Sequence, residues 1–240
     1  MNKKIAVVIL LALALLPTNA FAMHIMEGFL PPVWSIAWSV ICVPFIIIGL
    51  RSIQKKIIVD PKLKILLAMA GAFVFVLSAL KLPSVTGSCS HPTGVGLGAI
   101  LFGPFAMGVI GVIVLLFQAI LLAHGGITTL GANTFSMAIV GPFVAFFTYK
   151  IIKRFNGADW LAVFLAATLS DMLTYIVTSF QLAIAFPSPN GGIVFSFIKF
   201  LGVFALTQLP IAISEGILTV VIFNVLKQNS KKELESLGVI

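Results

Sequence analysis

Charged side chains are scarce in this sequence: 9% of its 240 residues are Asp, Glu, Lys or Arg, whereas 60% are hydrophobic. Soluble domains carry about 25% charged residues, so the composition excludes that class of protein. The sequence also lacks a phosphate-binding P-loop, a Gly-x-Ser-x-Gly nucleophile turn and a His-Glu-x-x-His metal pair. Any step driven by ATP therefore requires another subunit.

Cysteine and histidine are also rare, with two and three residues. Cys42 and Cys89 lie far apart, in or near apolar segments, which indicates no disulfide and predicts that Cys42 is a small packing residue. The net charge of +8 is typical of basic loops on the cytoplasmic side of a membrane protein, so we do not infer a nucleic-acid partner.

Long apolar runs predict an all-α protein that crosses the lipid bilayer of the cell membrane several times. The runs cover residues 33–50, 63–82, 96–123, 132–149, 159–186 and 194–226. The run 96–123 is unusually long and contains Gly103-Pro104, Gly108 and Gly111, which favours a break between Gly103 and Gly111.

Three groups of basic residues separate the runs, and the positive-inside rule places all of them in the cytoplasm. They are Arg51, Lys55, Lys56, Lys62 and Lys64; Lys150, Lys153 and Arg154; and Lys227, Lys231 and Lys232. An odd number of crossings must then connect the external 83–95 loop to Lys150. Splitting 96–123 into two spans gives about seven transmembrane helices, with the mature N-terminus outside and the C-terminus cytoplasmic. A re-entrant hairpin for 96–123 with five full crossings satisfies the same rule.

Residues 1–22 have the features of a secretory signal peptide: Lys3 and Lys4, a short apolar run, and small residues at Ala20 and Ala22. We therefore predict three parts: the signal at 1–22, a polytopic metal-binding membrane domain at 23–226 and a cytoplasmic tail at 227–240. Cleavage after Ala22 would give Met23 a free α-amine.

A chain that begins Met23-His24 can chelate one metal ion through its amine, the His24 amide nitrogen and the His24 Nδ1 atom. Three corners of a square plane are then filled, and His91, in a Gly/Ser/Pro loop, is our candidate fourth ligand. For His124, a supporting or loop-locking role is favoured over ligation because the plane is already complete. All three histidines are predicted on the outer side. Nitrogen ligation of this kind excludes Mg²⁺ and Ca²⁺ and disfavours Zn²⁺, which leaves Ni²⁺, Cu²⁺ and Co²⁺.

Three carboxylates invite a functional interpretation. Asp171 and Glu215 lie within apolar runs, where an acidic residue either takes part in function or hydrogen-bonds between helices. Glu27 is predicted outside, close to the metal site, where it would attract cations or hold the N-terminal segment.

Four segments resemble signatures of the CbiM-type cobalt-transport proteins, with the NikM nickel proteins as close relatives. They are Met23 to Pro32, Gly87 to Gly94, Gln118 to Asn133 and Pro210 to Gly216. The resemblance covers the chain from Met23 to about Leu226. It implies the substrate-binding membrane component of an energy-coupling-factor importer that supplies cobalt for cobalamin synthesis.

The resemblance also implies partners: a transmembrane coupling protein, ABC-type ATPases and a small auxiliary membrane protein, of the CbiQ, CbiO and CbiN types. It assigns the ligands to the Met23 amine, the His24 amide and imidazole, and the His91 imidazole. No cofactor is expected beyond the transported ion, Co²⁺ first and Ni²⁺ second. The alternatives are a proton-coupled secondary carrier and a membrane metalloenzyme, and the filled plane argues against the enzyme.

Overall fold

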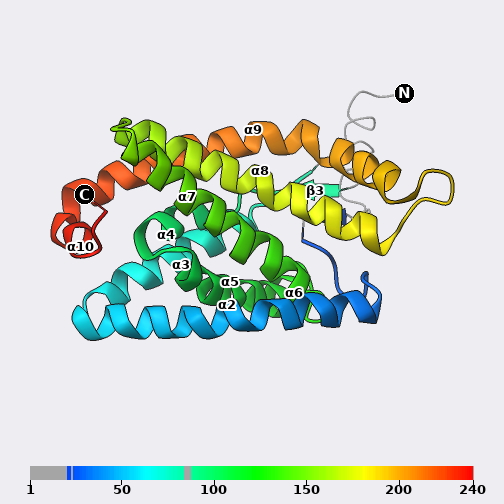
Figure 1. Ribbon diagram of the computed structural model, residues 1–240, viewed down its shortest axis with the longest axis horizontal. Helices are drawn as coiled ribbons and strands as arrows, with labels where there is room; N and C mark the ends of the chain where they lie inside the picture. Colours follow the sequence, from blue (N-terminus) through cyan, green and yellow to red (C-terminus); the bar gives the residue numbers. More distant parts are fainter. Residues whose placement is uncertain (1–20, 23, 84–87, 240) are drawn as a thin grey trace, which may run out of the picture.

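The computed structural model describes residues 21–22, 24–83 and 88–239 (Figure 1). Met23 and all but the last two residues of the predicted signal peptide lie outside the described residues. Helices make up most of the described chain, as the apolar runs predict. They are α2 (Pro32–Val59), α3 (Leu63–Ala79), α4 (Val95–Phe102), α5 (Pro104–Leu122), α6 (Leu130–Asn133), the π-helix η2 (Thr134–Val140), α7 (Gly141–Arg154), α8 (Asp159–Ala185), α9 (Gly192–Asn229) and α10 (Lys231–Ser236).

A small sheet at one end of the bundle joins segments that are far apart in the sequence. Its strands are β1 (Phe21–Ala22), β2 (Leu82–Pro83) and β3 (Ser88–Ser90), in the order β1-β3-β2. β1 pairs with β3 in parallel, and β2 pairs with β3 in antiparallel. The sheet therefore lies directly before the loop that carries His91.

The predicted break in the run 96–123 falls at Gly103, between α4 and α5. Gly103 has φ +83°, a left-handed conformation that glycine adopts without strain, and Pro104 follows as the first residue of α5. α4 has only 8 residues and so spans about 12 Å, which is well short of the ~30 Å hydrocarbon core. The predicted helix before Gly103 is thus much shorter than a transmembrane span.

Five helical segments in the described chain are long and apolar enough to cross a membrane. They are α2, α5, the continuous segment Leu130–Arg154, α8 and α9. α3 is apolar but has 17 residues. The described residues therefore support a multi-pass membrane protein with five helical segments of spanning length, and the seven spans predicted from the sequence are not confirmed.

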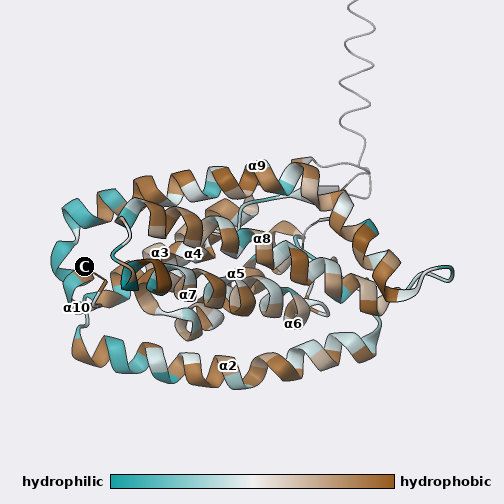
Figure 2. Cartoon of the chain, turned by 45° about the horizontal axis from the view of Figure 1, so that its top comes forward, coloured by the Kyte–Doolittle hydropathy of each residue, from teal (hydrophilic) through white to brown (hydrophobic). Residues whose placement is uncertain are grey.

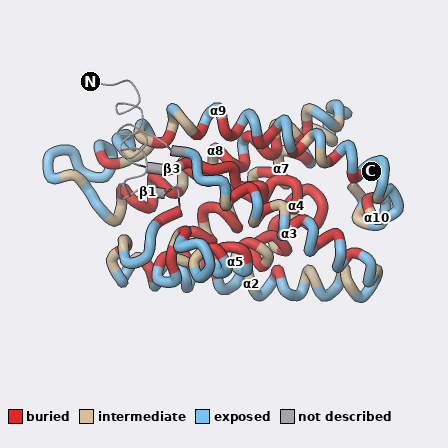
Figure 3. Tube along the Cα trace, turned by 180° about the vertical axis from the view of Figure 1, so that it is seen from behind, coloured by how far each residue is buried: buried red, intermediate tan, exposed pale blue. Residues whose placement is uncertain are grey.

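The long helices α2, α8 and α9 run along the longest axis of the bundle, and the buried helix α4 lies between them (Figure 1). α8 and α9 lie side by side along one flank and α2 lies along the opposite flank (Figure 1). Hydrophilic residues gather at the end that holds α10 and the last turns of α9 (Figure 2). The outer sides of α2 and α9 are exposed and apolar, as expected for surfaces that face lipid (Figure 3).

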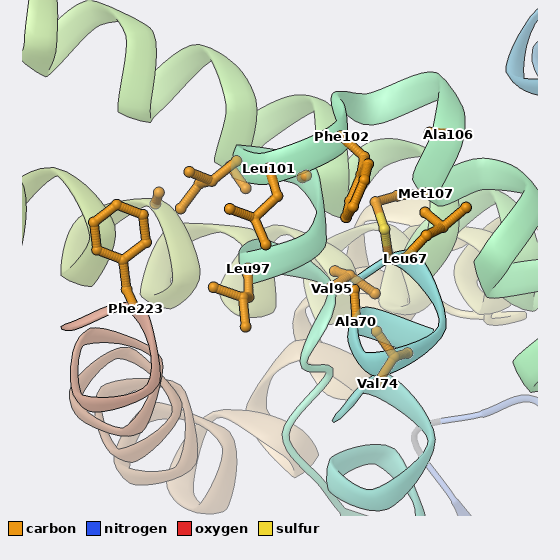
Figure 4. Close-up of a cluster of buried hydrophobic side chains, with 14 of the residues drawn as sticks. Leu67, Ala70, Val74, Val95, Leu97, Leu101, Phe102, Ala106, Met107 and Phe223 are labelled. Carbon is orange, nitrogen blue, oxygen red and sulfur yellow. The ribbon is translucent and has the colours of Figure 1, made fainter. Parts of the chain in front are cut away.

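Every residue of α4 is buried, and this helix forms the centre of the main hydrophobic core. Its side chains meet Leu67 of α3, Met107 of α5 and Phe223 of α9 (Figure 4). A second cluster surrounds Leu30 and Trp38 below the N-terminal segment. This second cluster includes Ile25 and Ala132, so it packs directly against the segments that carry His24 and Asn133.

Candidate metal site

The loop from Ser90 to Gly94 is non-helical and fully buried, which is an unusual state for a polypeptide backbone in a membrane protein. Such backbone is tolerated only where protein groups satisfy its polar atoms. Glu215 of α9 does so: it accepts hydrogen bonds from the Thr93 amide at 2.5 Å, the Thr93 hydroxyl at 3.0 Å and the Gly94 amide at 2.9 Å. One intramembrane carboxylate therefore fixes the loop two residues after His91.

Asp171 of α8 supports the same loop through Gln208 of α9. The Gln208 amide nitrogen lies 2.6 Å from Asp171 Oδ2 and 3.1 Å from the His91 carbonyl oxygen, and it can donate one proton to each. Of the two roles considered for Asp171 and Glu215, the structure shows the hydrogen-bonding one. These bonds join α8 and α9 to the loop that carries His91.

The N-terminal segment is held by the chain between α5 and η2. The Asn133 side chain makes two hydrogen bonds with the backbone of Ile25: it accepts from the Ile25 amide at 2.8 Å and donates to the Ile25 carbonyl oxygen at 3.0 Å. The Thr129 hydroxyl donates to the same carbonyl oxygen at 2.6 Å. Because Ile25 follows His24 directly, these three bonds set the position of the His24 backbone.

A second set of hydrogen bonds lies nearer the surface. The Glu27 amide donates to the Gly125 carbonyl at 3.2 Å, and the Gly28 amide donates to the Thr128 hydroxyl at 2.9 Å. The Thr128 amide in turn donates to the Glu27 carboxylate at 3.2 Å. Hydrogen bonding by Thr128 lowers the pKa of Glu27 below its usual value. Glu27 thus holds the N-terminal segment, one of the two roles expected for it.

The three histidines meet where the Ser90–Gly94 loop approaches the N-terminal segment. His24 Nδ1 lies 3.1 Å from His124 Nε2, and the ring centroids of His24 and His91 are 4.5 Å apart. One nitrogen from each ring lies within 4.8 Å of the other two, and all three residues are buried. Among the described residues, no Asp, Glu or Cys belongs to this group.

The His91 ring has a defined tautomer. A carbonyl oxygen cannot donate a proton, so the 3.0 Å contact between His91 Nδ1 and the Pro92 carbonyl requires a proton on Nδ1. The Nε2 atom then carries a lone pair, and it is buried with no hydrogen-bond partner. A hydrogen bond from the other ring nitrogen orients histidine ligands in metal sites, and the bare Nε2 lone pair is the donor that a metal ion requires.

Burial also keeps the other rings neutral. It lowers the pKa of His24 well below its usual value and lowers that of His124 to about 2, with the neighbouring imidazoles adding to the effect. The rings are therefore uncharged at neutral pH, and each has one nitrogen with a free lone pair. This donor set, without carboxylates, suits a borderline ion such as Co²⁺, Ni²⁺ or Cu²⁺ and does not suit Mg²⁺ or Ca²⁺.

The structure thus brings His24, His91 and His124 together, while Met23 lies outside the described residues. Sequence reasoning missed three supporting residues, Asn133, Gln208 and Met137, whose sulfur lies 3.1 Å from His24 Nε2. A polar amide within an apolar run was an available signal for Asn133 and Gln208. Met137 gave none, because methionine is common in hydrophobic cores.

A buried histidine cluster at one end of a bundle of membrane-crossing helices defines the class: a multi-pass membrane protein with a site suited to a metal ion. The model of the CbiM family, described as the cobalt uptake substrate-specific transmembrane region, matches residues 24–233. The chain therefore belongs to the CbiM family, as the sequence motifs predicted.

Individual relatives agree with this assignment. The chain is 62% identical to a cobalt transport protein CbiM of Clostridioides difficile, covering 97% of this chain and 94% of the relative. It is 64% identical to one of Acetoanaerobium sticklandii, covering 91% and 90%. A crystal structure of a truncated transition metal transporter has the same fold, with a TM-score of 0.76, 24% identity, and coverage of 86% of this chain and 99% of that one.

Proposed function

We propose that this protein is the substrate-capture component of an ATP-driven energy-coupling-factor importer for cobalt ions. The observation that supports this most strongly is the buried histidine cluster, in which His91 Nε2 has no hydrogen-bond partner and the centroids of the His91 and His24 rings lie 4.5 Å apart. Curated relatives with more than 60% identity are named cobalt transport proteins, which supports cobalt as the cargo. We expect the imported cobalt to supply cobalamin synthesis.

In this proposal the ion is held by four nitrogens: the Met23 amine, the His24 amide, His24 Nδ1 and His91 Nε2. The amine exists only if the signal peptide is removed after Ala22. The hydrogen bonds between Ile25 and Asn133 support this ligand set, because they fix the peptide that follows His24. His124 has a supporting role: its ring lies edge-on to the His24 ring, with the centroids 4.4 Å apart, and its 3.1 Å contact with His24 Nδ1 would give way to the ion.

Binding by four nitrogens is slow to reverse, so release requires work from another source. The sequence contains no P-loop for ATP. We therefore expect a coupling protein, a pair of ABC-type ATPases and a small auxiliary membrane protein, of the CbiQ, CbiO and CbiN types. Nickel is the alternative cargo, since the same donor set suits Ni²⁺.

The ligand set is tested by metal titration of the mature protein. His24→Ala and His91→Ala each remove a ligand and should abolish high-affinity Co²⁺ binding, whereas His124→Ala should retain most of it. His124→Ala is the matched control, because it removes a buried ring from the same cluster. Wild-type affinity in His91→Ala would overturn the proposed ligand set.

Energy coupling is tested separately by uptake of radiolabelled cobalt in cells. Uptake should stop when the Walker lysine of the partner ATPase is replaced. Rapid uptake with the inactive ATPase would instead favour a proton-coupled secondary carrier, for which the buried Asp171 and Glu215 would serve as proton relays.

A further inference from the structure

The second nitrogen of the His24 ring faces a sulfur atom. His24 Nε2 lies 3.1 Å from Met137 Sδ, and both side chains are buried. A thioether accepts a hydrogen bond weakly and has no proton to donate. Across this contact only His24 can be the donor, so a hydrogen bond to the sulfur places the His24 proton on Nε2.

The position of that proton decides whether His24 can bind a metal through Nδ1. A neutral imidazole carries one proton, so a proton on Nε2 leaves Nδ1 bare. The same Nδ1 lies 3.1 Å from His124 Nε2, where it can act as the acceptor. In the other tautomer, Nδ1 would donate to His124 and would be unavailable to an ion.

The backbone around Met137 is also irregular. Met137 lies in η2, and at its end the Gly141 amide bonds to the Ser136 carbonyl, five residues earlier. π-helical turns inside α-helices occur frequently at functional sites. Here the turn begins directly after Asn133, so one short segment contacts both the His24 ring and the Ile25 peptide.

We propose that Met137 is a positioning residue that selects the Nδ1-bare tautomer of His24 and so prepares this ring to bind the metal ion. The proposal rests on the proposed function in that it takes Nδ1 as a ligand atom. Its tautomer part concerns the metal-free protein and can be tested without any ion.

The test compares Met137→Leu, which keeps the apolar volume but removes the acceptor, with Met137→Gln, which restores an acceptor at nearly the same length. Met107→Leu is the matched control, since Met107 is equally buried but lies in the hydrophobic core. The mature protein, residues 23–240, is labelled with ¹⁵N-histidine, and its three histidines keep the spectrum simple. Co²⁺ affinity is measured by competition with a chelator.

In Met137→Leu we expect the ¹⁵N shifts of His24 to move toward the Nδ1-protonated form and the Co²⁺ affinity to fall about tenfold, the lower end of effects at residues behind a ligand. Met137→Gln should restore both, and Met107→Leu should change neither. Unchanged ¹⁵N shifts in Met137→Leu would overturn the proposal. Equal loss of affinity in the leucine and glutamine variants would do so too, because it would indicate a packing role. A wild-type protein that binds no Co²⁺ would refute the proposed function, while the tautomer comparison would still decide the role of Met137.

Discussion

At the scale of single residues, the site depends on backbone positions that admit no side chain. Gly126 lies under the N-terminal segment, and a Cβ atom built on it would come 2.4 Å from the Glu27 Cα atom. Real contacts of this kind do not occur, so the glycine allows the two backbones to approach. Close approach of this type is a common reason for glycine beside a binding site.

Gly126→Ala should therefore push the N-terminal segment away from the loop and weaken Co²⁺ binding by about tenfold, as for other residues behind a ligand. Gly202→Ala is the control, since a Cβ atom there meets nothing within 4 Å and the position is helical. It should leave binding unchanged. Equal affinities in the two variants, measured by chelator competition, would show that the close approach does not position His24.

The pH response of Glu27 belongs to the same scale. Its folded-state pKa is lowered by the bond from Thr128, so its contribution is present above the pKa of the unfolded chain and is lost as pH falls through the lower folded value. We expect the thermal stability of the protein to show a small loss in this acidic range that is absent in Glu27→Gln. If the melting temperatures of the wild type and Glu27→Gln fall in parallel as the pH is lowered, this role of Glu27 is contradicted.

At the scale of elements, Glu215 connects α9 to the buried loop. Its two oxygens face the amides of Thr93 and Gly94, and a glutamine can accept on one side only. Glu215→Gln should leave one buried amide without an acceptor and lower the free energy of unfolding by about 1–3 kcal/mol.

The control for this variant is Glu235→Gln in α10, whose carboxylate lies 3.8 Å from Lys231 Nζ on the surface. Exposed pairs of this type contribute little, so stability should be unchanged. The measurement is thermal unfolding of both variants in detergent, with and without Co²⁺. If Glu215→Gln unfolds at the wild-type temperature, the carboxylate is not needed to hold the loop.

The elements also show which features local sequence could predict. The apolar runs, the break at Gly103 and the closeness of His24 to His91 were predicted, because each depends on local composition or on the parity of crossings. The complete burial of α4 was not predicted, since hydropathy cannot distinguish a helix that faces lipid from one buried within the protein. Contacts such as Asn133 to Ile25 and Gln208 to His91 join residues 108 and 117 positions apart, so only the folded chain reveals them.

At the scale of the whole molecule, the orientation in the membrane remains a prediction. A cysteine at position 188, in the turn between α8 and α9, should react with an impermeant maleimide in intact cells. A cysteine at position 232, in α10, should react only after the membrane is opened. Both variants, Ser188→Cys and Lys232→Cys, would be made with Cys42 and Cys89 replaced by alanine. The reverse labelling pattern would mean that the histidines face the cytoplasm.

The length of α9 has a mechanical consequence. Its 38 residues extend about 57 Å, nearly twice the ~30 Å hydrocarbon core, and its far end is tied to α8 by the 2.6 Å pair of Lys227 with Asp159. Pro210 lies between Gln208 and Glu215, the two residues that hold the His91 loop, and it has no N–H to donate to the Leu206 carbonyl one turn earlier.

A bend of α9 at Pro210 would change the distance between Gln208 and Glu215. The loop could then not keep its hydrogen bonds to both residues at once. We expect bending of α9 at Pro210 to disturb the His91 loop and so to weaken the hold of this loop on the ion. A partner that never touches the metal would in this way empty a site buried at the other end of the molecule.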